Sequence, residues 1–288
     1  MNPDVFREIN IPTKLQTYFR RILVGQVTEP IQMEVEPRAT GYAYLSWIAQ
    51  GRWTGFVNDV LEIDSDTNGR VILSGQIDNA SIITRFEGPL WQVFAEFNAL
   101  GQQQFLGIPG IETLERAVGP QSLNSAVFKS IDERLSKFQD DASHEQLQQH
   151  FLQVLESTPE QQVSIPEYLH NGINKIEQCN GFCRIAEIAK IVGTSERQFR
   201  REFVQAVGLK PKNFCNVLQV NTALALLMNR EDSKIAELAT ECGFVDQAHL
   251  TRAFQKFLGA SPLSLAANAE ATVARFVGQC RAVENRVS

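Results

Sequence analysis

The segment "IAEIAKIVGT" (residues 185–194) recurs fifty residues later as "IAELATECGF" (residues 235–244). Each copy is followed by a stretch typical of a second helix, "SERQFRREFVQAVGLKP" after the first and "DQAHLTRAFQKFLGASP" after the second. The offset between matching residues changes from fifty to fifty-one just after the shared glycine. The copies therefore differ by one residue in a turn, which indicates a duplicated structural unit.

The local pattern predicts two helices joined by a short turn in each copy. In the first copy, apolar residues recur at i, i+3, i+4 and i+7 from Ile185 to Val192, as in an amphipathic helix. Gly193 follows where a left-handed residue ends a helix, and Thr194 or Ser195 can cap the next one. The predicted buried faces of the second helices are Phe199, Phe203, Ala206 and Val207, and Leu250, Phe254, Phe257 and Leu258. Such a unit matches the helix-turn-helix motif.

The faces opposite these buried sets carry Arg, Gln, Thr and Lys, side chains suited to reading base edges in a major groove. A solvated polar face would explain one such helix. It does not explain why an outward arginine recurs at the same place, as Arg201 and Arg252. The candidate DNA-binding residues are Arg197, Gln198, Arg200, Arg201, Gln247, His249, Thr251, Arg252 and Lys256.

Residues 166 to 265 resemble the DNA-binding domain of AraC/XylS-type bacterial transcription regulators. The most specific stretch is "GFVDQAHLTRAFQKFLGASP", and "TSERQFRREFVQAVGLKP" is also typical. The resemblance implies two helix-turn-helix units on either side of a long connecting helix, expected over 212–228, which read adjacent major-groove segments of double-stranded DNA. It also implies that seven of the candidates occupy the DNA-contacting positions: Arg197, Arg200, Arg201, Gln247, His249, Thr251 and Arg252. Gln219 and Leu265-Ala266 depart from the family pattern of basic residues, so we expect weakened phosphate contacts there.

Charge and composition divide the chain into two parts. Residues 161–288 hold 15 Lys+Arg and 12 Asp+Glu, a net charge of +3; residues 1–160 hold the remaining 12 basic and 21 acidic residues, a net charge of −9. The acidic excess therefore lies away from the candidate DNA-binding helices. We expect a β-rich effector-sensing and dimerisation domain with a helical end at 1–158 and a linker at 159–166. A DNA-binding domain with a C-terminal helical tail is expected at 167–288.

The fold class that follows is α+β. Strand candidates are "GYAYLSW" (41–47), a hairpin around Asn68-Gly69 within residues 60–77, and "ASIITRF" (80–86). Helices are expected at 89–107, 122–138 and 143–157. The N-terminal part is thus predicted as a β-rich barrel or sandwich with a helical hairpin, and the C-terminal part as all-α with two helix-turn-helix units.

The N-terminal part also resembles, less specifically, the uncharacterised domain that precedes the DNA-binding module in some AraC-type regulators, through "GPLWQVFAEFNALGQQQFLGIPGIETLERAVG" (88–119). This resemblance implies a sensing domain that binds a small-molecule effector and helps to dimerise the chain. Aromatic side chains could line the effector pocket or simply form the core. The candidates are Tyr42, Tyr44, Trp47, Trp53 and Trp91.

The sequence lacks the residues that several other functions would require. No histidine precedes His144, and no G-x-S-x-G motif occurs, which argues against a rival interpretation as an enzyme with a catalytic β-barrel. Cys179 and Cys183 lack two further zinc ligands nearby, so neither a metal nor a cofactor is expected. No apolar run of eighteen residues and no signal core occurs, and the five cysteines are an odd count; we expect a cytoplasmic protein away from the membrane.

Two apolar stripes indicate a further contact. One contains Val127, Ile131, Leu135 and Phe138, and the other contains Leu147, Phe151, Val154 and Leu155. They either cover the β unit or pair with a second chain, and we expect a homodimer through residues near 122–157. A regulator controlled by a protein partner instead of a small ligand is the main alternative. RNA polymerase is a further partner that a transcription regulator can contact.

Overall fold

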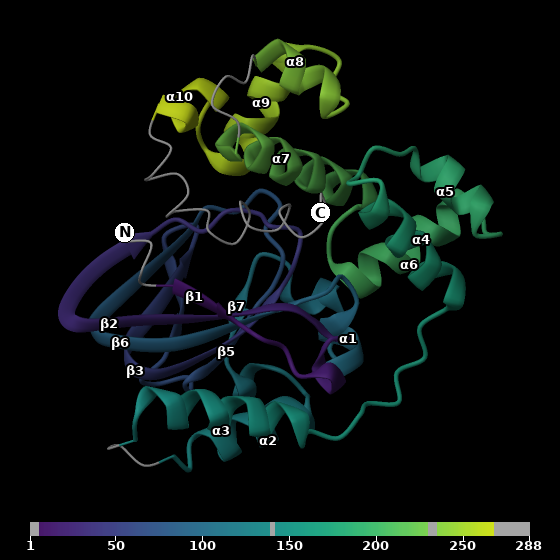
Figure 1. Ribbon diagram of the computed structural model, residues 1–288. Helices are drawn as coiled ribbons and strands as arrows, with labels where there is room; N and C mark the ends of the chain where they lie inside the picture. Colours follow the sequence, from purple (N-terminus) through teal and green to yellow (C-terminus); the bar gives the residue numbers. More distant parts are fainter. Residues whose placement is uncertain (1–5, 139–141, 230–234, 268–288) are drawn as a thin grey trace.

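A single antiparallel sheet occupies the centre of the N-terminal half, in a computed structural model that describes residues 6–138, 142–229 and 235–267 (Figure 1). The strands are β1 (Phe6–Ile9), β2 (Phe19–Val35), β3 (Tyr44–Val57), β4 (Val60–Asp64), β5 (Val71–Ser74), β6 (Ile82–Phe97) and β7 (Ala117–Val118). They follow the order β1-β2-β6-β3-β5-β7, and β4 pairs with β3. No pairing among the described residues joins β1 to β7. The expected barrel or sandwich is therefore one open, curved sheet, and the α+β class is confirmed.

The long strands bend where their register shifts. Between β3 and β6 the register shifts around Gln50, and the positive φ of Gly51 (85°) and Gly88 (86°) marks the two sides of the bend. A Cβ on Gly51 would lie 2.7 Å from the carbonyl oxygen of Pro89, so a side chain does not fit there. Such bulges increase the local twist of a sheet. The distal halves of the strands consequently enclose a second apolar cluster around Ile48, Trp53 and Phe86.

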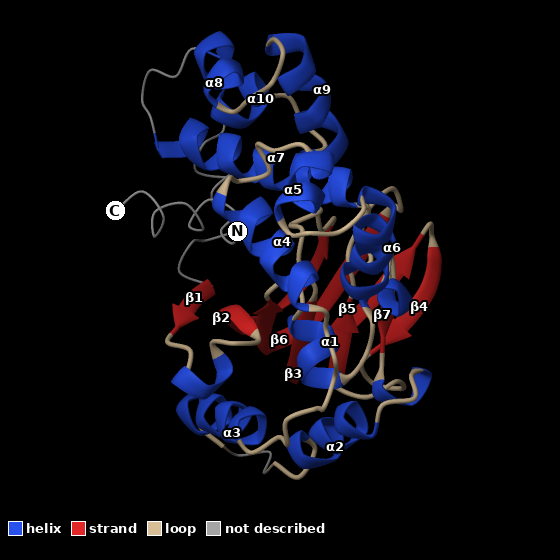
Figure 2. Cartoon of the chain, turned by 90° about the vertical axis from the view of Figure 1, so that its right-hand side faces the viewer, coloured by secondary structure: helices blue, strands red, loops and turns tan. Residues whose placement is uncertain are grey.

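Two helices cover one face of this sheet, α2 (Ala126–Leu135) and α3 (His144–Glu156) (Figure 2). Their apolar stripes are buried in one core with Trp47 and Trp91, and Ile131 and Phe151 are fully buried. The expectation that these stripes form a homodimer contact is wrong, because the sheet of the same chain already covers them. The homodimer itself stays a prediction, and these buried stripes are not available for it.

Two sequence expectations about the sheet are also wrong. Residues 89–97 are not helical but belong to β6, and only α1 (Gly101–Leu106) is helical within the expected helix. The helix-forming residues of this segment are overridden because β6 lies between β2 and β3, where Trp91 and Val93 are buried with the α2–α3 core.

The predicted hairpin around Asn68-Gly69 does not exist, because β4 and β5 both pair with β3. The tight turn lies at Asn58-Asp59, where both residues have positive φ and Val57 pairs with Val60. This matches the two left-handed residues of a type I′ turn.

The remaining helices build the C-terminal half on the other side of the sheet (Figures 1 and 2). They are α4 (Glu167–Gln178), α5 (Ile185–Ile191), α6 (Glu196–Val207), α7 (Pro211–Asn229), α8 (Ile235–Glu241), α9 (Gln247–Leu258) and α10 (Pro262–Ala267). Short 3-10 helices occur at η2 (Thr13–Leu15), η3 (Gly110–Thr113) and η4 (Pro120–Ser122). The C-terminal tail that was expected to be helical lies outside the described residues.

The two halves share buried contacts. Tyr42 packs in the apolar cluster of the first helical unit, and Ala39 packs in that of the second unit. The side chain of Asn221 on α7 donates a hydrogen bond to the carbonyl oxygen of Thr40 at 2.8 Å. The part of the chain from β1 to α3, called the sheet domain below, therefore contacts the connecting helix α7 and the core of each helical unit directly.

Candidate nucleic-acid interface

The first helical unit has the geometry that its sequence predicts. Helices α5 and α6 are joined by a turn in which Gly193 has a φ of 75°, the left-handed conformation that ends α5. Ser195 caps α6, since its hydroxyl accepts a hydrogen bond from the backbone N–H of Gln198 at 3.2 Å. The buried residues of α6 are Phe199, Phe203, Ala206 and Val207, as predicted.

The second unit repeats this arrangement. Helix α8 ends before Gly243, whose φ is 65°, and Asp246 caps α9 by accepting a hydrogen bond from the N–H of His249 at 2.7 Å. The negative charge of Asp246 is also favourable at a helix N-terminus. The buried residues of α9 are Leu250, Phe254, Phe257 and Leu258, again as predicted.

Helix α7 connects the two units and sets their separation. Its 19 residues correspond to about 28 Å of helix, against a repeat of about 34 Å between adjacent turns of the major groove. Gln219, which departs from the family pattern, donates to the carbonyl oxygen of Gly181 at 3.1 Å and so fixes the loop between α4 and α5 to α7. Leu265 is buried in the core of the second unit. Gln219 and Leu265 thus both help to hold the helical half together.

The outward face of α6 carries arginines that are paired with acidic side chains of the same helix. Arg197, Arg200 and Arg201 are exposed. Arg200 bonds Glu196 through Nε at 2.7 Å, and Arg201 lies 3.1 Å from the carboxylate of Glu202.

Gln198 is half-buried and ties this arrangement together. Its Oε1 accepts from Arg201 at 2.7 Å, and its Nε2 donates to Glu202 at 2.7 Å and to the hydroxyl of Tyr168 on α4 at 3.2 Å. The outward face of α6 is therefore cationic, but Arg200 and Arg201 already bond side chains of the same helix.

The outward face of α9 has no acidic residue of its own beyond the cap. Gln247, His249, Arg252 and Lys256 are exposed, and Thr251 is half-buried. Within the described ranges, no carboxylate pairs with Arg252. The ring of His249 packs edge-on against Phe244 at 5.3 Å, which orients it at the start of the helix. The structure thus places all nine sequence-predicted residues on α6 and α9.

The sequence did not indicate the role of Asp78, which follows β5 in the sheet domain. Its Oδ1 accepts a hydrogen bond from Asn213 on α7 at 2.7 Å and lies 4.0 Å from the Nζ atom of Lys256 on α9. Asp78 is therefore an acidic contact from the sheet domain to a predicted DNA-binding residue. Only the folded arrangement brings these residues together, since they are far apart in the chain.

The five aromatic residues proposed for an effector pocket do not come together. Trp47 and Trp91 pack edge-to-face at 5.7 Å in the core beneath α2 and α3, whereas Trp53 belongs to the cluster enclosed by the bend. The hydroxyl of Tyr44 donates to Glu96 at 2.6 Å, and Tyr42 lies at the interface with the helical half. The sheet distributes them over separate clusters, so the structure does not bring the five together. A role of any one of them in effector binding stays a prediction.

Cysteines gather where the loop after α4 meets α7. A hydrogen bond with Cys215 and burial raise the pKa of Cys183 above its ordinary value, and burial raises the pKa of Cys179 to about 11. The thiols of Cys179 and Cys183 therefore stay protonated at neutral pH. No three His, Cys, Asp or Glu side chains of the described residues are grouped so that they could hold a metal ion.

No described helix combines the length and the apolar character that a membrane crossing requires.

Comparisons with known proteins concern mainly the helical half. A family described as a helix-turn-helix domain matches residues 188–268. The HTH-type transcriptional regulator ArgR of Pseudomonas aeruginosa is 34% identical over 76 residues, which are 26% of this chain and 23% of that protein. An uncharacterized HTH-type transcriptional regulator of Haemophilus influenzae is 28% identical over 87 residues, covering 30% of this chain and 29% of that protein. The chain thus spans less than a third of the length of these curated relatives.

Solved structures give a broader but weaker likeness. An AraC-type transcriptional regulator from Chromobacterium violaceum is 26% identical, with a TM-score of 0.33, over 35% of this chain and 91% of that one. ToxT from Vibrio cholerae, in a structure with a bound butenoic acid derivative, is 13% identical with a TM-score of 0.46, over 88% of this chain and 99% of that one. Residues 188–268 thus match a helix-turn-helix domain, and both capped helices, α6 and α9, lie within this range.

Proposed function

We propose that this chain is a sequence-specific transcription regulator that inserts α6 and α9 into adjacent segments of the major groove of double-stranded DNA. The observation that carries the proposal is the pair of capped helices with exposed cationic faces, held at the two ends of α7. Arginine can bond a guanine edge with two hydrogen bonds, which is the commonest specific contact of such helices. Arg201 and Arg252 are the residues expected to read bases.

The charge distribution supports this assignment of roles. The acidic excess lies in the sheet domain, whereas the helical half carries the net positive charge that phosphates require. Because that charge is only +3 over residues 161–288, affinity for DNA of random sequence should be weak and should fall steeply with salt. Specific binding then depends on the base contacts of both helices.

The sheet domain is proposed to control these helices in response to a small molecule. Its contacts with α7, through Thr40 and Asp78, give it a physical route to the spacing of the two units. A ligand that binds one arrangement of the sheet domain more tightly than another would shift the balance between the two arrangements. The resulting change in DNA affinity can be no larger than the difference in ligand affinity between them.

The test is selection of binding sites from random duplexes with the full chain, followed by titration of the best site with Arg201→Ala and Arg252→Ala. Each change should weaken specific binding by about 1–3 kcal/mol, or roughly 5- to 150-fold. Arg85→Ala is the control, since Arg85 is an exposed arginine on the sheet domain that pairs with Glu34. Failure to select any site, or equal affinities for all three variants, would overturn the proposal.

A further inference from the structure

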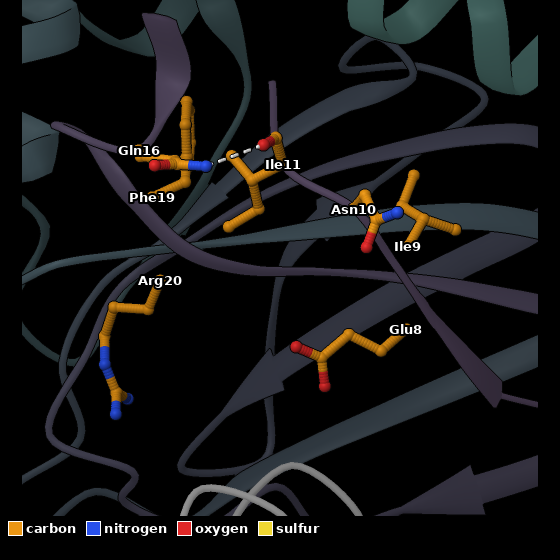
Figure 3. Close-up of a pocket in the computed structure, with 7 residues that line it drawn as sticks. All are labelled: Glu8, Ile9, Asn10, Ile11, Gln16, Phe19 and Arg20. Carbon is orange, nitrogen blue, oxygen red and sulfur yellow. Dashed lines mark hydrogen bonds between the residues drawn. The ribbon is translucent and has the colours of Figure 1, made fainter. Parts of the chain in front are cut away.

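A pocket lies where β1, η2 and the first residues of β2 meet, and nothing in the proposed DNA interface uses it (Figure 3). Its volume is about 470 Å³, within the range of sites for small molecules. Polar side chains in its lining are Glu8, Asn10, Gln16 and Arg20, and the half-buried Ile11 supplies apolar surface. The pocket is therefore suited to a small polar molecule with an apolar part.

Arg20 gives the pocket a cation with spare hydrogen-bonding capacity. Of the five N–H donors of a guanidinium, one bonds a described residue, through Nη1 to Glu96 Oε2 at 3.2 Å. Glu96 is already neutralised by Arg21, which donates from Nε at 2.9 Å and from Nη2 at 2.7 Å. Glu177 is a second carboxylate close to Arg20, so two acidic groups balance the two arginines. The side chain of Arg20 is nevertheless only 18% exposed, and its guanidinium keeps N–H donors that bond no described residue. Such donors suit an anionic partner.

Glu8 supplies the opposite charge on another wall. It is exposed, and no cation of the described residues pairs with it, including Arg20. In Figure 3 the carboxylate of Glu8 is turned toward the side on which Arg20 lies. Glu8 and Arg20 thus both line the pocket and form no ion pair with each other. A molecule that carries both an anionic and a cationic group would satisfy both walls at once.

We propose that this pocket binds a free amino acid, with the carboxylate at Arg20 and the ammonium group at Glu8. Asn10 and Gln16 add amide groups at the rim, although Gln16 Nε2 already donates to the carbonyl oxygen of Ile11 at 3.1 Å. The side chain of the amino acid lies against Ile11. As a proposal for the effector of the regulator, it rests on the proposed function, but the binding itself can be measured without DNA.

The same arginine connects the pocket to the first helical unit. Its guanidinium carbon lies 3.7 Å from the centre of the Tyr42 ring, a cation–π contact. The hydroxyl of Tyr42 donates to Glu177 of α4 at 2.8 Å. Two contacts therefore separate the pocket from the helix that precedes the first helix-turn-helix motif. Occupancy of the pocket redirects donors of Arg20 and so acts on this contact.

The experiment uses the full chain and each of the twenty standard amino acids, screened by thermal shift at millimolar concentration. The one with the largest shift is then titrated by calorimetry beside its carboxylate-only and amine-only analogues. Binding of a free amino acid should be at least about tenfold tighter than that of either analogue, because each analogue leaves one charged wall unpaired. No shift for any amino acid, or an equally tight analogue, overturns the inference.

Two variants locate the binding. Glu8→Gln and Arg20→Gln should each weaken binding about tenfold or more, whereas Glu29→Gln, an exposed carboxylate on β2 away from the pocket, should leave it unchanged. Glu8→Gln alters an exposed side chain, so it remains a valid test if Arg20→Gln fails to fold. Binding that survives both changes refutes the site. A chain that selects a DNA site but binds no amino acid refutes only this inference; one that binds an amino acid but selects no DNA refutes only the proposed function.

Discussion

Replacing Glu96 with glutamine tests the most heavily buried charge cluster of the sheet domain. Glu96 is fully buried on β6. It accepts hydrogen bonds from Arg20, Arg21 and the hydroxyl of Tyr44. Glutamine preserves the size and one acceptor oxygen but removes the charge. It therefore removes the Glu96 charge from two largely buried guanidinium groups that it compensates.

The expected cost follows from that arrangement. Removing one partner of a buried ion pair typically lowers the free energy of unfolding by about 3–5 kcal/mol, because the remaining charge loses its compensation. The matched control is Glu34→Gln, because Glu34 pairs with Arg85 at 2.9 Å but is 55% exposed. An exposed pair of this kind contributes about 0–1 kcal/mol. The two variants make the same chemical change in different surroundings.

The effect of Glu96 should also depend on pH. Burial by itself raises the pKa of Glu96, but the charges of Arg21 and Arg20 and the hydrogen bonds from Tyr44 and Arg21 hold the pKa below its ordinary value. A carboxyl with a lowered folded-state pKa stabilises the fold above its unfolded pKa of about 4.3, and this contribution is lost as the pH falls through the folded value. The wild-type chain should therefore lose stability between neutral and acidic pH more steeply than Glu96→Gln.

Urea unfolding followed by tryptophan fluorescence measures the free energy of unfolding of the wild type and both variants. The three tryptophans, Trp47, Trp53 and Trp91, all lie in the sheet domain, so the signal reports on the domain that contains Glu96. The reasoning would be refuted by a Glu96→Gln midpoint equal to that of Glu34→Gln at neutral pH. Equal pH dependence of the wild type and Glu96→Gln would show that Glu96 is not held ionised by its neighbours.

Two further changes probe the corrected core and the domain contact. Ile131→Ala should lower the free energy of unfolding by about 2–5 kcal/mol, because Ile131 is fully buried beneath the sheet. Sedimentation should show the same oligomeric state for this variant as for the wild type. A change in oligomeric state would indicate that the stripe containing Ile131 is a subunit contact after all. Asp78→Asn keeps an acceptor for Asn213 but removes the charge near Lys256, so affinity for a selected DNA site should rise by up to about fivefold. Anisotropy titrations at two salt concentrations measure this, and a loss of affinity in a folded variant would contradict it.

The helical half could be read from the sequence because its decisive interactions are local. Turn glycines, caps and the 3.6-residue period all lie within single units, so Gly193, Ser195 and the buried set beginning at Phe199 were identifiable without tertiary information. The second copy repeated the same signals and confirmed the register. What the sequence could not show is the pairing of Arg200 and Arg201 with acidic neighbours, since that depends on side-chain rotamers.

The sheet domain was less predictable because its strands are defined by their partners. The segment around Trp91 contains residues that favour helices, and only its position between β2 and β3 makes it a strand. The Asn68-Gly69 pair is a strong turn signal, yet the hairpin forms at Asn58-Asp59, where the register of β3 and β4 requires it. The pocket beside Arg20 was missed because Glu8 and Arg20 belong to different strands, and neither residue forms part of a recognisable motif.

The sheet domain contacts both helix-turn-helix units, so a change in it can affect α6 and α9 at the same time. The first unit is contacted through Tyr42 and Glu177, and the second through Asp78 and Lys256. Between them α7 is bonded through Asn221, so neither unit can shift along the sheet domain without breaking a hydrogen bond. Binding to two adjacent segments of the major groove requires a fixed spacing of α6 and α9. The hydrogen bonds of a misplaced helix to the bases weaken steeply as the donor–acceptor distance grows. For the proposed function, we therefore expect small movements of the sheet domain to alter DNA affinity.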